Sequence, residues 1–328
     1  MRKVRKAVIT AAGRGTRQYP ASSAVQKEMF PLVDADGLAK PIIQIIGEEA
    51  IAAGVEEICI VTQPGDEKQY RDYFRRMSDE TLRAFRGKDW AILQSEKLEE
   101  FGERLHFVAQ HKPEGYGDAV YQAREFVGDE PFLLMLGDHI YISANGDNCA
   151  TQLIRKYHAA GVGGVEAMSG VQPTAGKHLS LFGTIKGEPI DAAEGTYKVQ
   201  AIYEKPSEQY AGEHLRSAGL PPGYYLCHFG LHIFPPAIFD ALHHHISNNL
   251  REKGEIQLTS SQEYMREHLL KDGAYGACTI EGQRFDTGIP YGLMETQIAL
   301  ALAGKHRGEI VEAIARLLAE QLKSIAKR

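Results

Sequence analysis

The stretch KAVITAAGRGTRQYPASSAVQKEMFPLV, residues 6–33, decides the fold of this chain. Its beginning, Ala7–Thr10, is a short apolar run that predicts a buried strand. The strand leads directly into a loop of small residues, AAGRGTR at residues 11–17. Such a loop lets the backbone approach a ligand closely, and its exposed N–H groups form a concave site for an anion. The stretch therefore predicts a strand that delivers an anion-binding loop.

Two cations, Arg17 and Lys27, follow the loop. Guanidinium and ammonium groups pair with phosphate oxygens, so the combination suits a triphosphate better than a neutral ligand. The two common phosphate loops fit poorly. Position 18 is Gln18 where G-x-G-x-x-G requires its third glycine, and the spacing G-x-x-x-x-G-K-[ST] is absent.

The stretch resembles the signature of the sugar-1-phosphate nucleotidyltransferases, which is G-x-G-T-R followed by P and then by K-E. The matching residues are Gly13, Gly15, Thr16, Arg17, Pro20, Lys27 and Glu28. The segment KEMFPLVD at residues 27–34 is most similar to the branch that makes UDP-glucose from UTP and glucose 1-phosphate. The resemblance covers roughly residues 6–303 and implies a nucleotidyltransferase enzyme.

Composition limits the other functional classes. The chain has 328 residues, of which 43% are apolar and 24% are charged, and its net charge is −6. That charge gives no general attraction to nucleic acid, so an anion site must be a local cluster of cations. No apolar stretch reaches 18 residues, and the apolar run after the basic N-terminus is too short for a signal peptide. We expect no nucleic-acid or membrane partner and a cytoplasmic location.

Strand and helix patterns alternate through the first half of the chain. Strands are predicted at residues 57–62, 104–110 and 132–136, and helices at 42–51, 67–77, 118–126 and 152–160. This alternation implies right-handed crossovers and a largely parallel sheet that is covered on both faces. The resemblance implies an α/β fold, a three-layer α/β/α sandwich with a mostly parallel central sheet and a small sugar-binding lobe.

The second half is richer in strands. They are predicted at residues 164–168, 182–186, 197–204, 225–234 and 275–280, with helices at 236–243 and 257–270. We expect one nucleotidyltransferase domain over residues 1–305. Its nucleotide-binding part spans about residues 1–160 and its sugar-binding part about 161–305.

Two helices are predicted in the tail, near residues 291–303 and 308–326, and residues 306–328 form an amphipathic C-terminal segment. The apolar face of the last helix consists of Ile310, Ile314, Leu317, Leu318, Leu322 and Ile325. This face packs either on its own domain or against another subunit. A homo-oligomer, dimer or tetramer, is expected.

Nucleotidyl transfer requires no covalent intermediate on the protein, because the phosphate of a sugar 1-phosphate is already an anionic nucleophile. Catalysis must come from positioning and from charge neutralisation by a metal and by cations. The resemblance implies that Arg17 contacts the β- and γ-phosphates and stabilises the departing pyrophosphate. It also implies that Lys27 reaches a phosphate, while Glu28 either orients Lys27 or contacts the base.

Two carboxylates are candidate metal ligands. Asp138 ends the apolar strand at residues 132–136, where an isolated charge is costly unless it is paired or bound to metal. Asp286, in the segment FDTG, matches the second carboxylate of the family. Mg²⁺ prefers one or two carboxylates together with phosphate oxygens, so Mg²⁺ is the expected cofactor. Each Asp has the alternative of forming a turn or a helix cap. His139 is either a plain loop residue or a contact to metal or substrate.

The expected nucleotide-binding residues lie in two loops. In the first loop they are Ala12, Gly13, Gly15, Thr16 and Glu28. In the second, Gln110 matches the position at which the family recognises uracil, and its amide offers both a donor and an acceptor. Gly115 matches the glycine of the loop that contacts base and sugar. Asp118 stands where the family commonly has histidine.

Glu204-Lys205-Pro206 resembles the sugar-phosphate site of the family. Glu204 would accept hydrogen bonds from sugar hydroxyls, and Lys205 would pair with the sugar phosphate as a fourth catalytic residue beside Arg17, Lys27 and Asp138. Gly183 matches a glycine whose backbone contacts the glucose ring. The segment GEIQLT at residues 254–259 is expected to support this lobe structurally.

Two rival hypotheses stay open. One is a nucleotidyltransferase that makes a dTDP-, ADP- or CDP-sugar, because Gln110 does not separate uracil from thymine. The other is a homologue without catalytic activity that binds a sugar nucleotide. Such a homologue would be expected to lose Arg17, Lys27, Asp138 or Lys205, and this chain has all four.

Overall fold

The computed structural model describes residues 2–191 and 194–325. The described residues group into two compact units. The first unit comprises those within Met1–Gly13, Ala50–Leu136 and Ala150–Ile280, and the second comprises those within Arg14–Glu49, Gly137–Cys149 and Glu281–Arg328.

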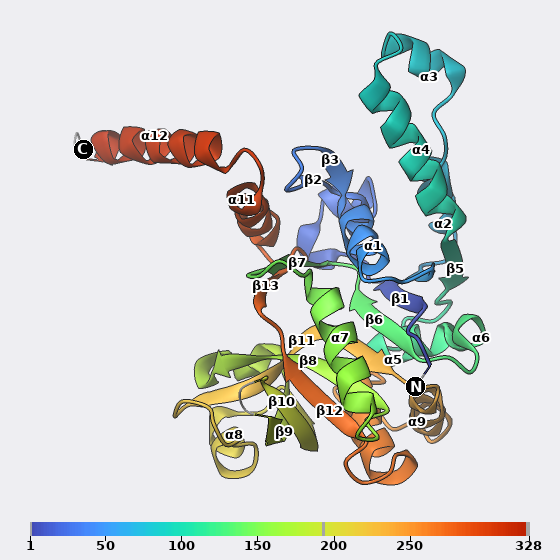
Figure 1. The fold of residues 1–328 in the computed structure, drawn as a ribbon, viewed down its shortest axis with the longest axis vertical. Helices are drawn as coiled ribbons and strands as arrows, with labels where there is room; N and C mark the ends of the chain where they lie inside the picture. Colours follow the sequence, from blue (N-terminus) through green and yellow to red (C-terminus); the bar gives the residue numbers. More distant parts are fainter. Residues whose placement is uncertain (1, 192–193, 326–328) are drawn as a thin grey trace. The chain divides into compact units, whose positions relative to one another are not determined.

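The first unit is built on a nine-stranded sheet in the order β5-β4-β1-β6-β11-β8-β12-β10-β9 (Figure 1). Its strands are β1 (Lys6–Ala11), β4 (Glu57–Thr62), β5 (Leu105–Ala109), β6 (Phe132–Leu136), β8 (Ala167–Ala175), β9 (Gly183–Asp191), β10 (Thr196–Glu204), β11 (Tyr224–Phe234) and β12 (Tyr275–Thr279). The strands β5, β4, β1 and β6 are parallel to one another. Beyond β6 the sheet is mixed, with β8 and β12 parallel and the remaining pairs antiparallel.

Helices lie on both sides of this sheet, which confirms the predicted α/β class. Those within the first unit are α2 (Glu67–Tyr73), α3 (Asp79–Ala84), α4 (Asp89–Glu103), α5 (Tyr116–Gln122), α6 (Arg124–Val127), α8 (Glu208–His214), α9 (Ala237–Ser247) and α10 (Leu258–Tyr264). Helices α1 (Ile42–Ala52) and α7 (Cys149–Gly161) each span a boundary between the units. Among the described residues, no helix combines the length and apolarity needed to cross a membrane.

The core of the first unit forms where apolar runs become central strands. In β6 the residues Phe132–Met135 are completely buried, and they lie between β1 and β11. Complete burial of one such side chain contributes roughly 1.5–3 kcal/mol. The strands predicted at 57–62 and 132–136 have the predicted bounds, because a short apolar run bounded by turn residues is typical of a fully buried strand.

The second unit contains two small antiparallel pairs. The strand β7 (His139–Ser143) pairs with β13 (Gly282–Asp286), and β2 (Pro31–Val33) pairs with β3 (Ala39–Pro41). None of these strands was predicted from the sequence. Each is short and only partly buried, so its apolar pattern is too weak to distinguish a strand from a loop.

Several predicted bounds were wrong. The strand predicted at 164–168 begins only at Ala167, because Gly164 forms a turn with a φ of +94°. The helix predicted at 118–126 is two helices, α5 and α6, and begins at Tyr116. The helix predicted at 67–77 ends at Tyr73, and the one predicted at 257–270 is divided into α10 and a π-helical turn, Met265–Leu269.

The tail contains α11 (Gly292–Ala303) and α12 (Arg307–Ile325). On α12, Leu317, Leu318 and Leu322 of this face are exposed and Ile310 and Ile314 are half-buried, so the face is only partly covered by the described residues of its own chain. The predicted helix end at Ala326, the rest of the segment to residue 328 and the side chain of Ile325 lie outside the described residues.

Candidate functional site

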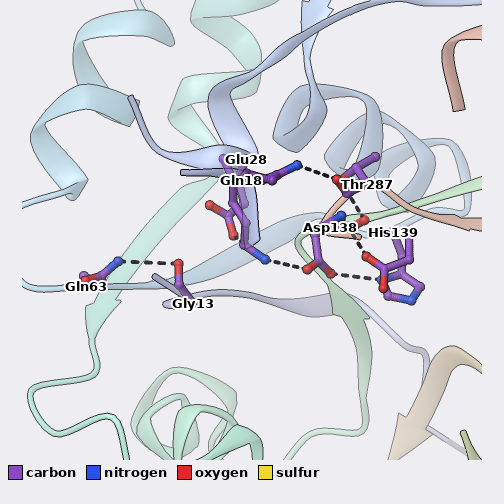
Figure 2. A network of polar contacts seen from close by, with 10 residues as sticks. Gly13, Gln18, Glu28, Gln63, Asp138, His139 and Thr287 are labelled. Carbon is purple, nitrogen blue, oxygen red and sulfur yellow. Dashed lines mark hydrogen bonds and ion pairs between the residues drawn. The ribbon is translucent and has the colours of Figure 1, made fainter. Parts of the chain in front are cut away.

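The β7–β13 pair of the second unit brings together three side chains that could ligate a metal ion. His139 and Asp286 are direct partners in the antiparallel register. The backbone carbonyl of Asp138 accepts hydrogen bonds from both the N–H and the hydroxyl of Thr287, each at 2.9 Å. As a result, ligand atoms of Asp138, His139 and Asp286 all lie within 4.8 Å of one another. Figure 2 shows Asp138 between Thr287 and His139.

Gly288 keeps the space between the two carboxylates open. A Cβ atom at this position would lie 2.9 Å from Oδ2 of Asp138 and 3.1 Å from Oδ1 of Asp286. It would also lie 3.4 Å from Nη2 of Arg17, so the guanidinium group of Arg17 borders the same space. The N–H of Gly288 donates to Asp286 Oδ1 at 2.8 Å and fixes that carboxylate. Two carboxylates and an imidazole around an open space form a donor set that fits a divalent cation.

Lys27 occupies one side of this cluster. Its Nζ lies 2.5 Å from Asp138 Oδ2 and 3.5 Å from Glu28 Oε1. Burial alone would lower the pKa of Lys27, but the negative charges of Asp138 and Glu28 raise it above its usual value. Gly15, with a φ of +60°, packs closely against Ser22, because a Cβ at this position would lie 3.0 Å from Cβ of Ser22, and it is in ordinary contact with Lys27. Lys27 is therefore a fixed cation at neutral pH.

Asp138 stays ionised in this surrounding. Burial would raise the pKa of its carboxyl, but the contacts with His139 and Lys27 outweigh burial and hold the pKa far below its usual value. Nδ1 of His139 lies 2.9 Å from Asp138 Oδ1. Each oxygen of the carboxylate thus has one nitrogen partner on the protein.

Glu28 differs from Asp138, because burial raises the pKa of its carboxyl to about 8 against the opposing charge of Lys27. The side chain is 1% exposed, and its Oε2 has no hydrogen-bond partner among the described residues. Because the folded-state pKa lies above the ordinary value of 4.5, the carboxyl favours folding below pH 4.5, and this contribution is lost as the pH rises through about 8.

Replacing Glu28 by Gln is therefore expected to raise the melting temperature relative to wild type more at pH 9 than at pH 5. The difference in melting temperature between Glu28→Gln and wild type should be roughly 5 °C larger at pH 9 than at pH 5, since 1 kcal/mol changes Tm by about 2–4 °C in a domain of this size. Calorimetry of both proteins across this range measures it. The exposed Glu96 supplies the control variant Glu96→Gln. Parallel Tm curves for Glu28→Gln and wild type would contradict the raised pKa.

The phosphate loop contributes residues to both units. Ala12 and Gly13 directly follow β1 in the first unit, where Gln63 donates to the carbonyl of Gly13 at 3.5 Å, as Figure 2 shows. Thr16 and Arg17 lie in a 3₁₀ turn of the second unit, Thr16–Gln18, and both side chains are exposed. Gln18 donates to the carbonyl of Thr287 at 2.5 Å and ties this turn to the end of β13.

Gln110 follows β5 in the first unit, at the same edge of the parallel strands as Ala12. Its Nε2 donates to Asp118 Oδ2 at 2.7 Å and to the carbonyl of Gly115 at 3.1 Å. Gly115 has a φ of +125°, and a Cβ there would lie 2.7 Å from the carbonyl of Ile256, so only glycine fits. The structure brings Gln110 and Gly115 together, as the sequence analysis expected.

Glu204 and Lys205 lie at the end of β10 in the first unit and line a groove of about 860 Å³. Glu204 Oε2 accepts a hydrogen bond from Thr259 Oγ1 at 2.6 Å, while Glu204 Oε1 lies 3.1 Å from Lys205 Nζ. A Cβ on Gly183 would lie 3.3 Å from Glu204 Oε2, so its backbone borders the same carboxylate. The three predicted sugar-site residues are thus neighbours.

Sequence reasoning gave no role in the site to Thr259, Gly288 or Asp118, and left His139 open. Gly288 is the last residue of the FDTG segment. Its role in the site depends on the pairing of β7 with β13, which the segment alone does not reveal. Thr259 belongs to the segment that was expected only to support the lobe. Asp118 stands where the family commonly has histidine. This difference was the sequence signal for its contact with Gln110.

Comparison with known proteins gives consistent matches. The family model described as nucleotidyl transferase matches residues 6–297. UTP–glucose-1-phosphate uridylyltransferase 2 of Staphylococcus saprophyticus is 35% identical over 320 residues, which are 97% of this chain and 99% of the relative. UTP–glucose-1-phosphate uridylyltransferase of Bacillus subtilis is 33% identical over 324 residues, with 97% and 98% covered.

Solved structures agree with these relatives. The UTP-bound UGPase of Acinetobacter baumannii has a TM-score of 0.76 at 25% identity, with 96% of this chain and 99% of that chain covered. A UDP-glucose pyrophosphorylase complexed with UDP-glucose has a TM-score of 0.69 at 27% identity, with 90% and 98% covered. The two solved structures and the family model therefore agree on the same fold.

Proposed function

Since this chain belongs to the nucleotidyl transferase family, we propose that it transfers the uridylyl group of UTP to glucose 1-phosphate, giving UDP-glucose and pyrophosphate. The observation that carries the choice of substrates is the near-complete coverage of relatives with this activity in their names. A phosphate oxygen of the sugar attacks the α-phosphorus in line, and the bond to the departing pyrophosphate breaks. No proton has to be removed from the nucleophile, which agrees with a site that has cations rather than a general base.

The phosphate end of the reaction is assigned to the second unit. In this proposal Arg17 binds the β- and γ-phosphates and stabilises the leaving pyrophosphate through its planar guanidinium fork. Lys27 pairs with a phosphate, and Glu28 holds the ammonium group in place from the buried side. The 3.5 Å separation between Lys27 Nζ and Glu28 Oε1 supports the orienting role of Glu28 over a contact with the base.

Mg²⁺ is the proposed cofactor, with Asp138 and Asp286 as ligands and His139 as a third donor at the same space. The space that Gly288 leaves open supports this assignment. When bound, the ion neutralises charge on the phosphates and polarises the α-phosphoryl group. The fold holds these residues in position: the β7–β13 pair aligns His139 with Asp286, and Thr287 fixes the backbone of Asp138.

The nucleotide is assigned to the loops that follow β1 and β5. The backbone of Ala12, Gly13, Gly15 and Thr16 approaches the phosphates, and Gly115 borders the base and ribose. Gln110 contacts the uracil. An imide edge is common to uracil and thymine, so a dTDP-sugar activity is the second candidate, and Gln110 by itself favours neither.

The sugar phosphate is assigned to the groove at the end of β10. Glu204 accepts from sugar hydroxyls, and its hydrogen bond from Thr259 holds the carboxylate in one orientation. The backbone of Gly183 lies beside the same carboxylate and borders the sugar ring. Lys205, whose side chain is 41% exposed, is free to move onto the phosphate of the sugar.

Replacing Lys205 by Ala is expected to raise the dissociation constant of glucose 1-phosphate by about 10- to 100-fold and to leave that of UTP unchanged, because a charge-assisted contact to one substrate is lost. Separate calorimetric titrations of each substrate measure this. Lys253 lines the same groove and provides the matched variant Lys253→Ala. An equal loss for both substrates, or the same effect from Lys253→Ala, would contradict the assignment.

Pyrophosphate release tests the function as a whole. The chain is incubated with each of UTP, dTTP, CTP and ATP and with a panel of sugar 1-phosphates, with Mg²⁺ present. UTP with glucose 1-phosphate should give the highest kcat/KM. A higher value with dTTP supports the second candidate. If the chain binds UTP but releases pyrophosphate with no combination of nucleotide and sugar 1-phosphate, the result supports the alternative that it is a non-catalytic binding protein.

The assembly, location and domain division belong to the same proposal. The exposed leucines of α12 support a homo-oligomer, and light scattering on the full chain compared with Leu318→Lys tests it.

A cytoplasmic location follows from the use of UTP. The nucleotide-binding part at about residues 1–160 and the sugar-binding part at about 161–305 are proposed as functional parts, with residues 306–328 as the C-terminal helix.

A further inference from the structure

The amide of Gln110 is held in one orientation. Gln110 is 6% exposed, and its two neighbours, the carboxylate of Asp118 and the carbonyl of Gly115, can only accept hydrogen bonds. If the amide were turned around, its oxygen would face two oxygens. The amino group must therefore point at Asp118 and Gly115, and both of its hydrogens are used there.

Asp118 is itself fixed. It is 7% exposed, and Gln122 Nε2 donates to its Oδ1 at 2.9 Å and to its backbone carbonyl at 3.3 Å. Its other oxygen, Oδ2, accepts from Gln110. Both hydrogen bonds to this buried carboxylate thus come from glutamine amides. A buried charge is costly without such partners, so an aspartate here fits a directing role better than a packing role.

We propose that Asp118 is a positioning residue that selects the base through Gln110. With the amino group of Gln110 engaged, the carbonyl oxygen Oε1 is the atom left for a ligand, and among the described residues no group donates to it. The expectation that Gln110 presents a donor and an acceptor is corrected here: it presents an acceptor.

An acceptor placed against ring atom N3 selects bases in which N3 carries a hydrogen. The imide nitrogen N3 of uracil carries a hydrogen and can donate to Oε1. The N3 atom of cytosine carries a lone pair, which would face the lone pairs of Oε1. This inference deepens the proposed function and rests on it, because it assumes that the base lies against Gln110.

The central test is the ratio of kcat/KM for UTP over CTP in wild type and in Asp118→Asn. Asparagine keeps the size of Asp118 but must turn its amino group toward either Gln110 or Gln122, so one donor faces another donor. Gln110 and Gln122 are each also held by one backbone carbonyl, that of Gly115 at 3.1 Å and that of Asp118 at 3.3 Å, so neither arrangement dominates and a substantial fraction of the Gln110 amides turns around. The UTP:CTP ratio of wild type should be at least about 10³ and should fall at least about tenfold in Asp118→Asn.

A second variant distinguishes a change in the orientation of the Gln110 amide from a general loss of structure in the surrounding loop. In Asp118→Asn combined with Gln122→Leu, Asn can turn its oxygen back to Gln110, so the UTP:CTP ratio should recover. Gln122→Leu alone should keep the wild-type ratio, because the Asp118 carboxylate still accepts from Gln110. The UTP:dTTP ratio should stay constant in every variant, since thymine also carries N3–H.

The outcomes separate this inference from the proposed function. A wild-type chain that uses CTP as well as UTP contradicts the proposed function. A selective wild type with an equally selective Asp118→Asn variant overturns the role of Asp118 and leaves the proposed function intact. A relaxed ratio that the double variant does not restore also overturns it, because simple damage to the loop would have the same effect.

Discussion

Replacing Asp138 by Asn is expected to lower kcat by about 10³-fold, because several kcal/mol of charge stabilisation are lost and each ~1.4 kcal/mol is a factor of ten. Asp138 is the one side chain that contacts both Lys27 and His139 among the described residues of the cluster. Its removal takes away a proposed metal ligand and also the anion that holds the ammonium of Lys27. Asn has the same shape and can keep a contact to each neighbour, so folding should persist.

Pyrophosphate release at saturating substrates measures the loss of kcat, and Mn²⁺ titration followed by electron paramagnetic resonance measures metal binding directly. Asp36→Asn is the control, because Asp36 pairs with Lys40 elsewhere in the same unit. Its kcat should be unchanged. Full activity of wild type in excess chelator, or Mn²⁺ binding by Asp138→Asn equal to wild type, would exclude the metal role of Asp138.

Replacing Arg17 by Lys is expected to lower kcat by about 10²–10³-fold, the usual effect of removing a donor to charge that develops in the transition state. The dissociation constant for UTP should change much less. Lysine keeps the positive charge but lacks the planar fork that binds two oxygens at once. The guanidinium of Arg17 borders the space between the carboxylates of Asp138 and Asp286, where lysine has no equivalent geometry.

Single-turnover kinetics together with UTP binding measurements distinguish the effect of Arg17→Lys on turnover from its effect on UTP affinity. Arg14 lies in the same loop, is exposed and provides the matched variant Arg14→Lys, which should retain the wild-type kcat. If Arg17→Lys instead weakens UTP binding and keeps kcat, Arg17 is a ground-state anchor for the triphosphate and has no special role at the leaving group.

The sequence by itself determined the strands that carry the loops. The apolar runs at residues 57–62 and 132–136 have their predicted bounds, and the small-residue loop follows β1 as expected. This succeeded because a fully buried strand leaves a continuous apolar signal that needs no information from distant residues. The fold class and the family followed from the same local evidence.

The neighbourhood of Gln110 was predicted only in part. The sequence placed Gln110 at the end of a strand predicted at residues 104–110 and Gly115 in the next loop, whereas β5 ends one residue earlier, at Ala109, and Gln110 follows it. The orientation of the amide was not predictable, because a glutamine side chain gives no local signal of which end faces a ligand. The carboxylate of Asp118, in the first turn of α5, decides it.

The cluster around Asp138 shows what only the tertiary structure decided. Asp138 and Asp286 were recognised separately, as two acids at the ends of segments. Their approach depends on the pairing of β7 with β13, two five-residue strands that are far apart in the chain. Such strands are too short and too exposed to have a clear pattern, and their register is fixed by their partner rather than by their own residues. For that reason the sequence identified the acids, whereas the fold alone put His139 opposite Asp286 and left the open space at Gly288.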